Sequence, residues 1–424
     1  MVTLRGFDKM AGLQRFSALR HRDYRIAWIA SMLSGGAMWT FIVASSWMVF
    51  NESDQSTWVG IITFASMLPF LLVSPIAGLM GDALDRKMLV SATMVMSAVS
   101  VIAMAGMSFI DILELWHVAV FAFVLGSTRA FQEPPLASLI PNLVPREDLL
   151  NALVLAGATR HGARFFGLLI ASPMLAIDMI GVNGVLVMSG SFHILAAWQM
   201  FRISTISRGE TDSKRGVVRN IFEGLIYIYK NQVLAVFMLL VAFHCALVMS
   251  FESVLPILSS DILGATDGST VGYLFMGFGA GALVGMFLLA GVRSDRLKGR
   301  TLFWTGITSG ISPILLAVVS SVPLAVFSSA AMGASQGVFM ALTSTYVQSI
   351  APDRLRSRIS SLYILHAGGI MAFANLGYGF MADAFSAPPI LLVTAVIFLV
   401  IVVGLSRSQP VLRQVYRTGD VVLG

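Results

Sequence analysis

Charged residues are scarce in this chain, since Asp, Glu, Lys and Arg make up only 12% of its 424 residues. Soluble domains average about 25%. Apolar residues make up 57% of the chain, and its mean hydropathy is +0.83. This composition excludes a soluble globular enzyme, which needs far more polar surface, and it excludes a disordered chain. The single cysteine, Cys245, excludes an intramolecular disulfide and a cysteine-based zinc site.

Long apolar runs follow one another along the whole chain. Each run is about as long as the ~20 residues that a helix needs to cross a bilayer, and about twice as long as a barrel strand. We therefore predict an all-α membrane protein with twelve transmembrane helices. The predicted helices cover residues 24–50, 58–81, 88–110, 116–140, 149–176, 181–202, 232–260, 270–292, 301–320, 322–348, 358–383 and 386–406.

Lysine and arginine are absent from every second loop. Numbered alternately from the N-terminus, one set of loops and termini holds 25 of the 28 Lys and Arg residues, and the other set holds none. The loops without basic residues carry eight acids: Glu52, Asp54, Asp111, Glu114, Asp178, Asp261, Asp267 and Asp383. Because basic loops stay in the cytoplasm, the pattern predicts cytoplasmic N and C termini. Topology thus accounts for the net charge of +6, and we expect no nucleic-acid partner.

The two halves of the chain repeat each other. Asp82 follows the second predicted helix and Asp295 follows the eighth, 213 residues later; Pro145 and Pro352, after the fourth and tenth, are 207 residues apart. Parallel repeats of this kind form two lobes around a site near the midplane. We predict an N-terminal six-helix lobe at 1–202, a cytoplasmic linker with an amphipathic helix at 203–231, a C-terminal six-helix lobe at 232–406 and a cytoplasmic tail at 407–424.

The pattern Gly78-x-x-x-Asp82-x-x-x-Arg86 after the second helix resembles the signature of the major facilitator superfamily. The segments 16–25 and 352–359 resemble the branch that includes bacterial siderophore and macrolide exporters. The resemblance implies a monomeric transporter of small molecules in the lipid bilayer of the bacterial inner membrane. Alternating access would be powered by a proton gradient, without a cofactor.

The resemblance also assigns gating roles to the signature loop and its repeat. The expected gating residues are Asp82, Asp85, Arg86, Asp295 and Arg300. The alternative for Arg86 is that it only sets the topology of the loop.

Ionisable residues inside the predicted helices are few. Arg129, Glu133, Arg160, Arg164 and Glu252 lie there, and an intramembrane arginine costs about 2.5–3.5 kcal/mol on insertion scales. Helix rise places Arg129 and Arg160 roughly 16 Å deep. Such residues usually face the transport pathway, so we predict that they contact substrate or coupling ion. The alternative is a structural Arg129–Glu133 pair at i and i+4.

Two further residues belong to the predicted site. His244 lies at a similar depth in the opposite half, as a substrate contact or a packing histidine. Glu252 lies about 30 Å along its helix, which predicts a position near the outer mouth, as a solvated acid or a proton site.

The predicted substrate follows from the charge balance. The arginines of the first half outnumber its intramembrane acids, so an anionic or zwitterionic ligand would supply the missing partner. We predict proton-coupled export of an organic molecule such as a siderophore or drug. The Gly-Pro exporter signature of the superfamily is replaced by Gly167-Leu168, which keeps proton-coupled uptake of an organic anion open, beside a lipid flippase or a sensor. No catalytic constellation and no metal-ligand spacing occurs in the sequence.

Overall fold

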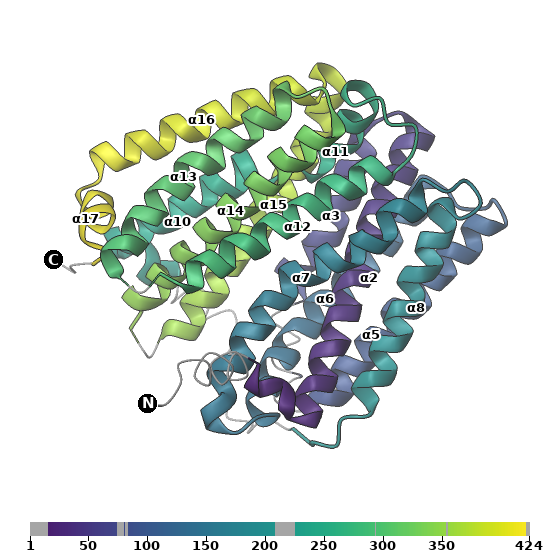
Figure 1. Cartoon of the computed structure of the whole chain (residues 1–424), viewed down its shortest axis with the longest axis horizontal. Helices are drawn as coiled ribbons and strands as arrows, with labels where there is room; N and C mark the ends of the chain where they lie inside the picture. Colours follow the sequence, from purple (N-terminus) through teal and green to yellow (C-terminus); the bar gives the residue numbers. More distant parts are fainter. Residues whose placement is uncertain are drawn as a thin grey trace, which may run out of the picture.

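The computed structural model describes residues 16–73, 80, 84–207, 225–292, 294–352 and 355–420. These residues form helices and contain no strand (Figure 1). The long helices in chain order are α2 (Arg22–Ser53), α3 (Ser56–Leu72), α5 (Arg86–Phe109), α6 (Leu115–Leu139), α7 (Leu149–Leu175), α8 (Gly181–Phe201), α10 (Gln232–His244), α12 (Ser269–Ala290), α13 (Asp295–Val318), α14 (Val322–Ile350), α15 (Arg356–Phe385) and α16 (Ala387–Ser408). The all-helical prediction is confirmed for the described part of the chain.

Apolarity and length set nine helical segments of the described residues apart as candidate membrane spans. The shorter α3 is also apolar. Helices α6 and α7 are long enough but carry the charges Arg129, Glu133, Arg160 and Arg164, and they are not among these nine. Charges in membrane helices are tolerated where they face protein rather than lipid. We therefore expect a functional site beside these two helices.

The predicted helix boundaries differ from the structure mainly at two places. Helix α13 begins at Asp295, six residues before the predicted start. The prediction from hydropathy left out this first turn because it is too polar to lie in hydrocarbon, but Asp295 is favourable at a helix N-terminus. The second difference lies in the seventh predicted helix.

The seventh predicted helix is not continuous, contrary to the sequence-based expectation for 232–260. It ends at His244 and passes into π-helical residues Cys245–Met249, a 3₁₀ turn Glu252–Val254, the short α11 (Leu255–Ile257) and π-helical residues Leu258–Ile262. Side chains of other helices replace the lost backbone bonds: Gln336 Nε2 donates to the Val248 carbonyl at 2.9 Å, and Tyr378 OH to the Leu247 carbonyl at 3.0 Å. Backbone disruption of this kind often marks a functional position.

Helices of the first half of the chain pack mainly on one another, and so do those of the second half (Figure 1). In the first half α2 packs on α7 and α8, and α5 on α6 and α8. In the second half α12 packs on α14, and α13 on α14 and α16. Two helix pairs join the halves extensively, α3 with α15 and α7 with α12. The position of one half relative to the other therefore depends mainly on these two helix–helix interfaces.

Small residues permit the close approach of the helices. A Cβ on Gly379 of α15 would lie 2.6 Å from the Ser56 carbonyl of α3, and one on Gly272 of α12 would lie 2.3 Å from Ser172 Oγ of α7. Within the second half, a Cβ on Gly281 of α12 would lie only 1.8 Å from the Ala330 carbonyl of α14. Small residues at this spacing are typical of helix contacts in membranes.

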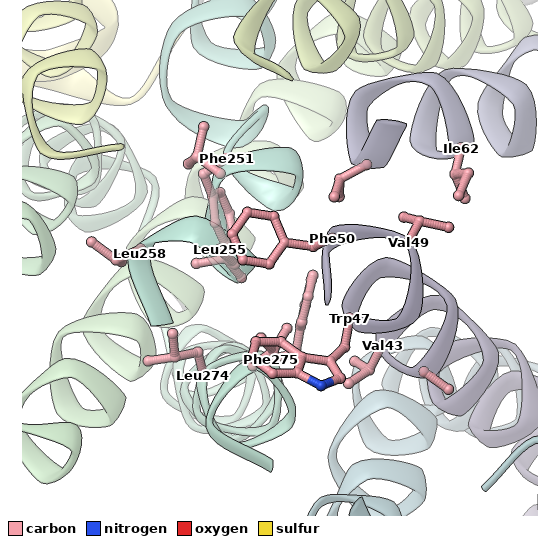
Figure 2. Packing of buried hydrophobic residues seen from close by; sticks show 14 of the residues in the cluster. Val43, Trp47, Val49, Phe50, Ile62, Phe251, Leu255, Leu258, Leu274 and Phe275 are labelled. Carbon is pink, nitrogen blue, oxygen red and sulfur yellow. The ribbon is translucent and has the colours of Figure 1, made fainter. Parts of the chain in front are cut away.

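A hydrophobic core extends across both halves at the end where α2 finishes. Figure 2 shows Trp47 and Phe50 of α2 beside Phe251, Leu255 and Phe275 of the second half. All five side chains are buried. This end of the molecule is therefore closed by apolar packing between the halves.

Candidate transport site

A buried ion pair links the two halves of the chain. The Nη2 atom of Arg164, on α7, lies 3.9 Å from Oε1 of Glu252, in the 3₁₀ turn that follows the break after α10. Their side chains are only 6% and 7% exposed. Of the two alternatives that the sequence left for Glu252, the solvated, interfacial acid is therefore wrong, and the proton site stays a prediction. The depth calculated for Glu252 assumed an unbroken helix, whereas the break after α10 turns this carboxylate toward α7.

Three aromatic rings surround the Arg164 guanidinium. Its Cζ lies 3.9 Å from the ring centre of Trp39 on α2, and 4.6 and 4.3 Å from those of Phe275 and Phe278 on α12. Nε and Nη2 of Arg164 donate no hydrogen bond within the described residues. A desolvated cation–π contact is worth about 2 kcal/mol. Rings from both halves, together with one carboxylate, thus hold this cation.

A second charge cluster lies one helical turn away along α7. On α6, Nε of Arg129 lies 3.4 Å from Oε1 of Glu133, which is the i,i+4 pair that the sequence allowed. Nη2 of Arg160 on α7 lies 4.0 Å from the other carboxylate oxygen of Glu133. The Arg160 side chain is 66% exposed. Two cations therefore share one acid here, and Arg160 is the more accessible of them.

The charge balance of the site differs from the expectation in one respect. The sequence assigned no acid to Arg164, because only Glu133 was available within the first half. The structure supplies Glu252 from the second half. Three arginines and two acids leave one excess positive charge, which now falls on the partly exposed Arg129–Glu133–Arg160 cluster.

His244 does not join these arginines. Its Nε2 lies 2.7 Å from Ser309 Oγ on α13, and its ring packs 4.4 Å from Phe339 and 5.3 Å from Phe398, measured between ring centres. The side chain is fully buried among helices of the second half. This position matches the packing alternative for His244 rather than a substrate contact.

The predicted gating loop of the first half is described only in part, because Gly78 and Asp82 lie outside the described residues. Asp85 caps α5 by accepting hydrogen bonds from the backbone N–H groups of the first turn. Arg86 Nη1 donates to the Ser138 carbonyl at 3.1 Å and to Ser207 Oγ at 3.2 Å. Arg86 thereby connects the start of α5 with the end of α6 and the segment after α8.

The repeat of this loop in the second half is built differently. Asp295 pairs with Lys298 in its own helical turn, at 2.8 Å between Oδ1 and Nζ. Arg300 is exposed. A Cβ on Gly299 would lie 1.9 Å from the Val415 carbonyl, because the short helix α17 (Pro410–Thr418) packs on this turn. The described parts of the two predicted gating loops therefore differ in their contacts.

Asp383 is a contact between the halves that the sequence interpretation missed, since it counted this residue only among the loop acids. The carboxylate, at the end of α15, accepts hydrogen bonds from the backbone N–H groups of Ser56 at 2.5 Å and Thr57 at 3.0 Å. It caps the start of α3, where orphan N–H groups and the helix dipole favour a carboxylate. An acid ending one helix and a Ser-Thr pair beginning another were the available signals.

Comparisons with known proteins place this architecture in a family. The family model of transmembrane secretion effectors matches residues 13–415. The multidrug efflux pump Tap of Mycolicibacterium fortuitum is 26% identical over 391 residues, which span 87% of this chain and 94% of that protein. Macrolide efflux protein A of Enterococcus faecalis is 24% identical over 328 residues, spanning 74% and 96%.

Solved structures share the fold. The nucleoside transporter NupG superposes with a TM-score of 0.71 at 11% identity, covering 91% of this chain and 98% of that one. A bacterial homologue of the human lysosomal transporter Spinster, in an inward-facing and occupied conformation, gives 0.68 at 15% identity, covering 91% and 96%. With its helical architecture and its family match, the chain belongs to the transmembrane secretion effectors of the major facilitator superfamily, and it is a multi-pass membrane transporter of small molecules, not an enzyme.

Proposed function

We propose that this protein exports an organic small molecule from the bacterial cytoplasm by proton-coupled alternating access, without a cofactor. All twelve helical segments would cross the inner membrane, with both termini in the cytoplasm. The lobes 1–202 and 232–406 would rock as units joined by 203–231. The named activities of its relatives, multidrug and macrolide efflux, support the export direction.

The observation that carries the proposal is the Arg164–Glu252 pair. Alternating access needs contacts between the lobes that form in one state and break in another. This pair takes one charge from each lobe and buries both. Separating the lobes on the Asp383 side would move Glu252, Phe275 and Phe278 away from Arg164 together. The pair therefore stabilises the state in which the lobes are closed on that side.

Proton coupling would act through the same pair. A proton bound to the Glu252 carboxylate cancels its negative charge and removes the counter-charge of Arg164. The closed state would then hold an unpaired buried cation, which is strongly unfavourable. Proton uptake by Glu252 would therefore promote opening on the Asp383 side, and proton release would favour closure.

Arg160 suggests the substrate class. Its guanidinium is the exposed one of the three arginines and shares Glu133 with Arg129. A carboxylate or phosphate on the solute would form a bidentate contact there. We therefore retain an anionic or zwitterionic organic solute, such as a siderophore or an acidic drug, as the proposed cargo.

Reconstitution in proteoliposomes tests the proposal. We would measure flux of an anionic siderophore, a macrolide and a lipophilic cation with and without an imposed pH gradient. We expect gradient-driven export of the anionic or zwitterionic compound, lost in Glu252→Gln and weakened in Arg160→Gln. Gradient-driven accumulation in the opposite direction would establish uptake, and transport of only the lipophilic cation would refute the assignment of Arg160.

A further inference from the structure

The short helix α17 is docked on the end of the second half. Figure 1 shows it turned across the end of α16, at the same end of the molecule as the start of α2. Its own residues Leu412 and Val415 are fully buried. The Tyr416 ring packs 5.2 Å from that of Phe303 on α13, and Gly299 permits the backbones to touch. One side of α17 is thus fixed against the bundle.

Exposed arginines surround this docked helix. We call them the α17 basic surface: Arg296 and Arg300 from α13, Arg407 from α16, and Arg413 and Arg417 from α17. Arg296 and Arg300 are one helical turn apart, as are Arg413 and Arg417. None of the five forms an ion pair with a described residue. Among the described residues of α13, α16 and the segment 410–420, the acids are Asp295, which is paired with Lys298, and Asp420.

Several basic residues at the corresponding end of the first half are held differently. Lys87 Nζ donates to the Ile203 carbonyl at 3.0 Å, and Arg86 donates to the Ser138 carbonyl at 3.1 Å. Arg202 donates to Gln199 at 2.9 Å. Positive charge on the cytoplasmic side is explained by topology, but topology does not explain why five guanidinium groups gather on and beside α17 without an ion-pair partner among the described residues.

We propose that the α17 basic surface binds the phosphate headgroups of anionic phospholipids in the cytoplasmic leaflet. Guanidinium groups match phosphate oxygens bidentately, and juxtamembrane basic clusters attract anionic lipids. An amphipathic helix whose arginines flank its apolar side suits the headgroup layer. Trp304, 61% exposed on α13 one turn beyond Arg300, lies where an interfacial aromatic anchor is expected. The choice of leaflet rests on the proposed orientation of the termini.

Lipid titration of the detergent-purified full-length protein tests the inference. Dioleoyl phosphatidylglycerol, dioleoyl phosphatidylcholine and glycerol phosphate would be added separately, with retained lipid read by native mass spectrometry and stability by the melting temperature. We expect phosphatidylglycerol alone to be retained and to raise the melting temperature. Each arginine lost should weaken binding about fivefold, so Arg413→Gln with Arg417→Gln should weaken it about 25-fold.

Matched variants separate lipid binding from loss of folding. Arg20→Gln with Arg146→Gln removes the same charge from exposed residues of the first half and should leave binding unchanged. Arg413→Lys with Arg417→Lys keeps the charge and should retain most of the affinity. Equal retention of phosphatidylcholine, equal loss in the Arg20/Arg146 variant, or equal binding of glycerol phosphate would overturn the inference. Because these readouts need neither substrate nor gradient, they are independent of the export assay.

Discussion

Replacing Glu252 by glutamine should open the interface between the halves at the Asp383 end. At 3.9 Å between Nη2 and Oε1, and an effective dielectric of about 20, the Arg164–Glu252 attraction is about 4 kcal/mol. Breaking a buried pair by removing one partner costs about 3–5 kcal/mol, because the other charge stays buried. Arg164 can regain water only if the halves separate, so the cost falls on the closed state.

Cysteine labelling measures this shift. Ser56 is fully buried where α3 meets α15, and Cys245 is buried, so a Ser56→Cys reporter in a Cys245→Ala background reports opening. At 1.4 kcal/mol per tenfold, a shift of about 3 kcal/mol should raise the labelling rate by a membrane-impermeant maleimide about 100-fold. Glu133→Gln is the matched control, because its pairs are partly exposed and worth at most about 1 kcal/mol.

A double-mutant cycle decides whether the pair itself is responsible. Arg164→Gln should also raise the labelling rate, because it leaves Glu252 buried without a partner. The double variant should label more slowly than either single variant, since no unpaired charge remains. Effects that simply add in the double variant, or a Glu252→Gln rate equal to that of Glu133→Gln, would refute the account.

Three further predictions follow from other contacts. Asp383→Asn weakens the cap on α3 and should raise Ser56→Cys labelling about tenfold, as capping contacts contribute about 0.5–2 kcal/mol; unchanged labelling would contradict this. Gly281→Ala should lower the melting temperature by several degrees, because its Cβ meets the α14 backbone, whereas Gly404→Ala, with open space around it, should not. Hydrogen bonds from Ser17 and His21 lower the pKa of Asp148, so this carboxylate stabilises the fold above the unfolded pKa of about 3.9 and loses its contribution as pH falls through the lowered value. Protection from hydrogen exchange at 17–20, expressed relative to the intrinsic rate at each pH, should therefore fall on acidification, and Asp148→Asn should abolish that pH dependence.

The helices and the identity of the charged residues could be predicted from the sequence. A long apolar run in lipid must satisfy its own backbone hydrogen bonds, which a helix does. Within the described residues, the predicted ranges other than 232–260 therefore lie mainly on single helices of the structure. Rare intramembrane charges are costly, so Arg129, Glu133, Arg160 and Arg164 stood out without coordinates. Their spacing along single helices also gave the Arg129–Glu133 pair.

The partners across the halves depended on tertiary structure. Helical periodicity relates residues within one helix, whereas Glu252 reaches Arg164 only because the chain breaks after His244 and the two halves meet. Trp39, Phe275 and Phe278 are ordinary apolar residues in the sequence, and only packing turns them into a cation cage. The amino-acid sequence by itself determined which segments cross apolar surroundings and which charges are unusual, since both follow from solvation of single residues. The fold decided which charges pair, because pairing depends on distances between helices far apart in the chain.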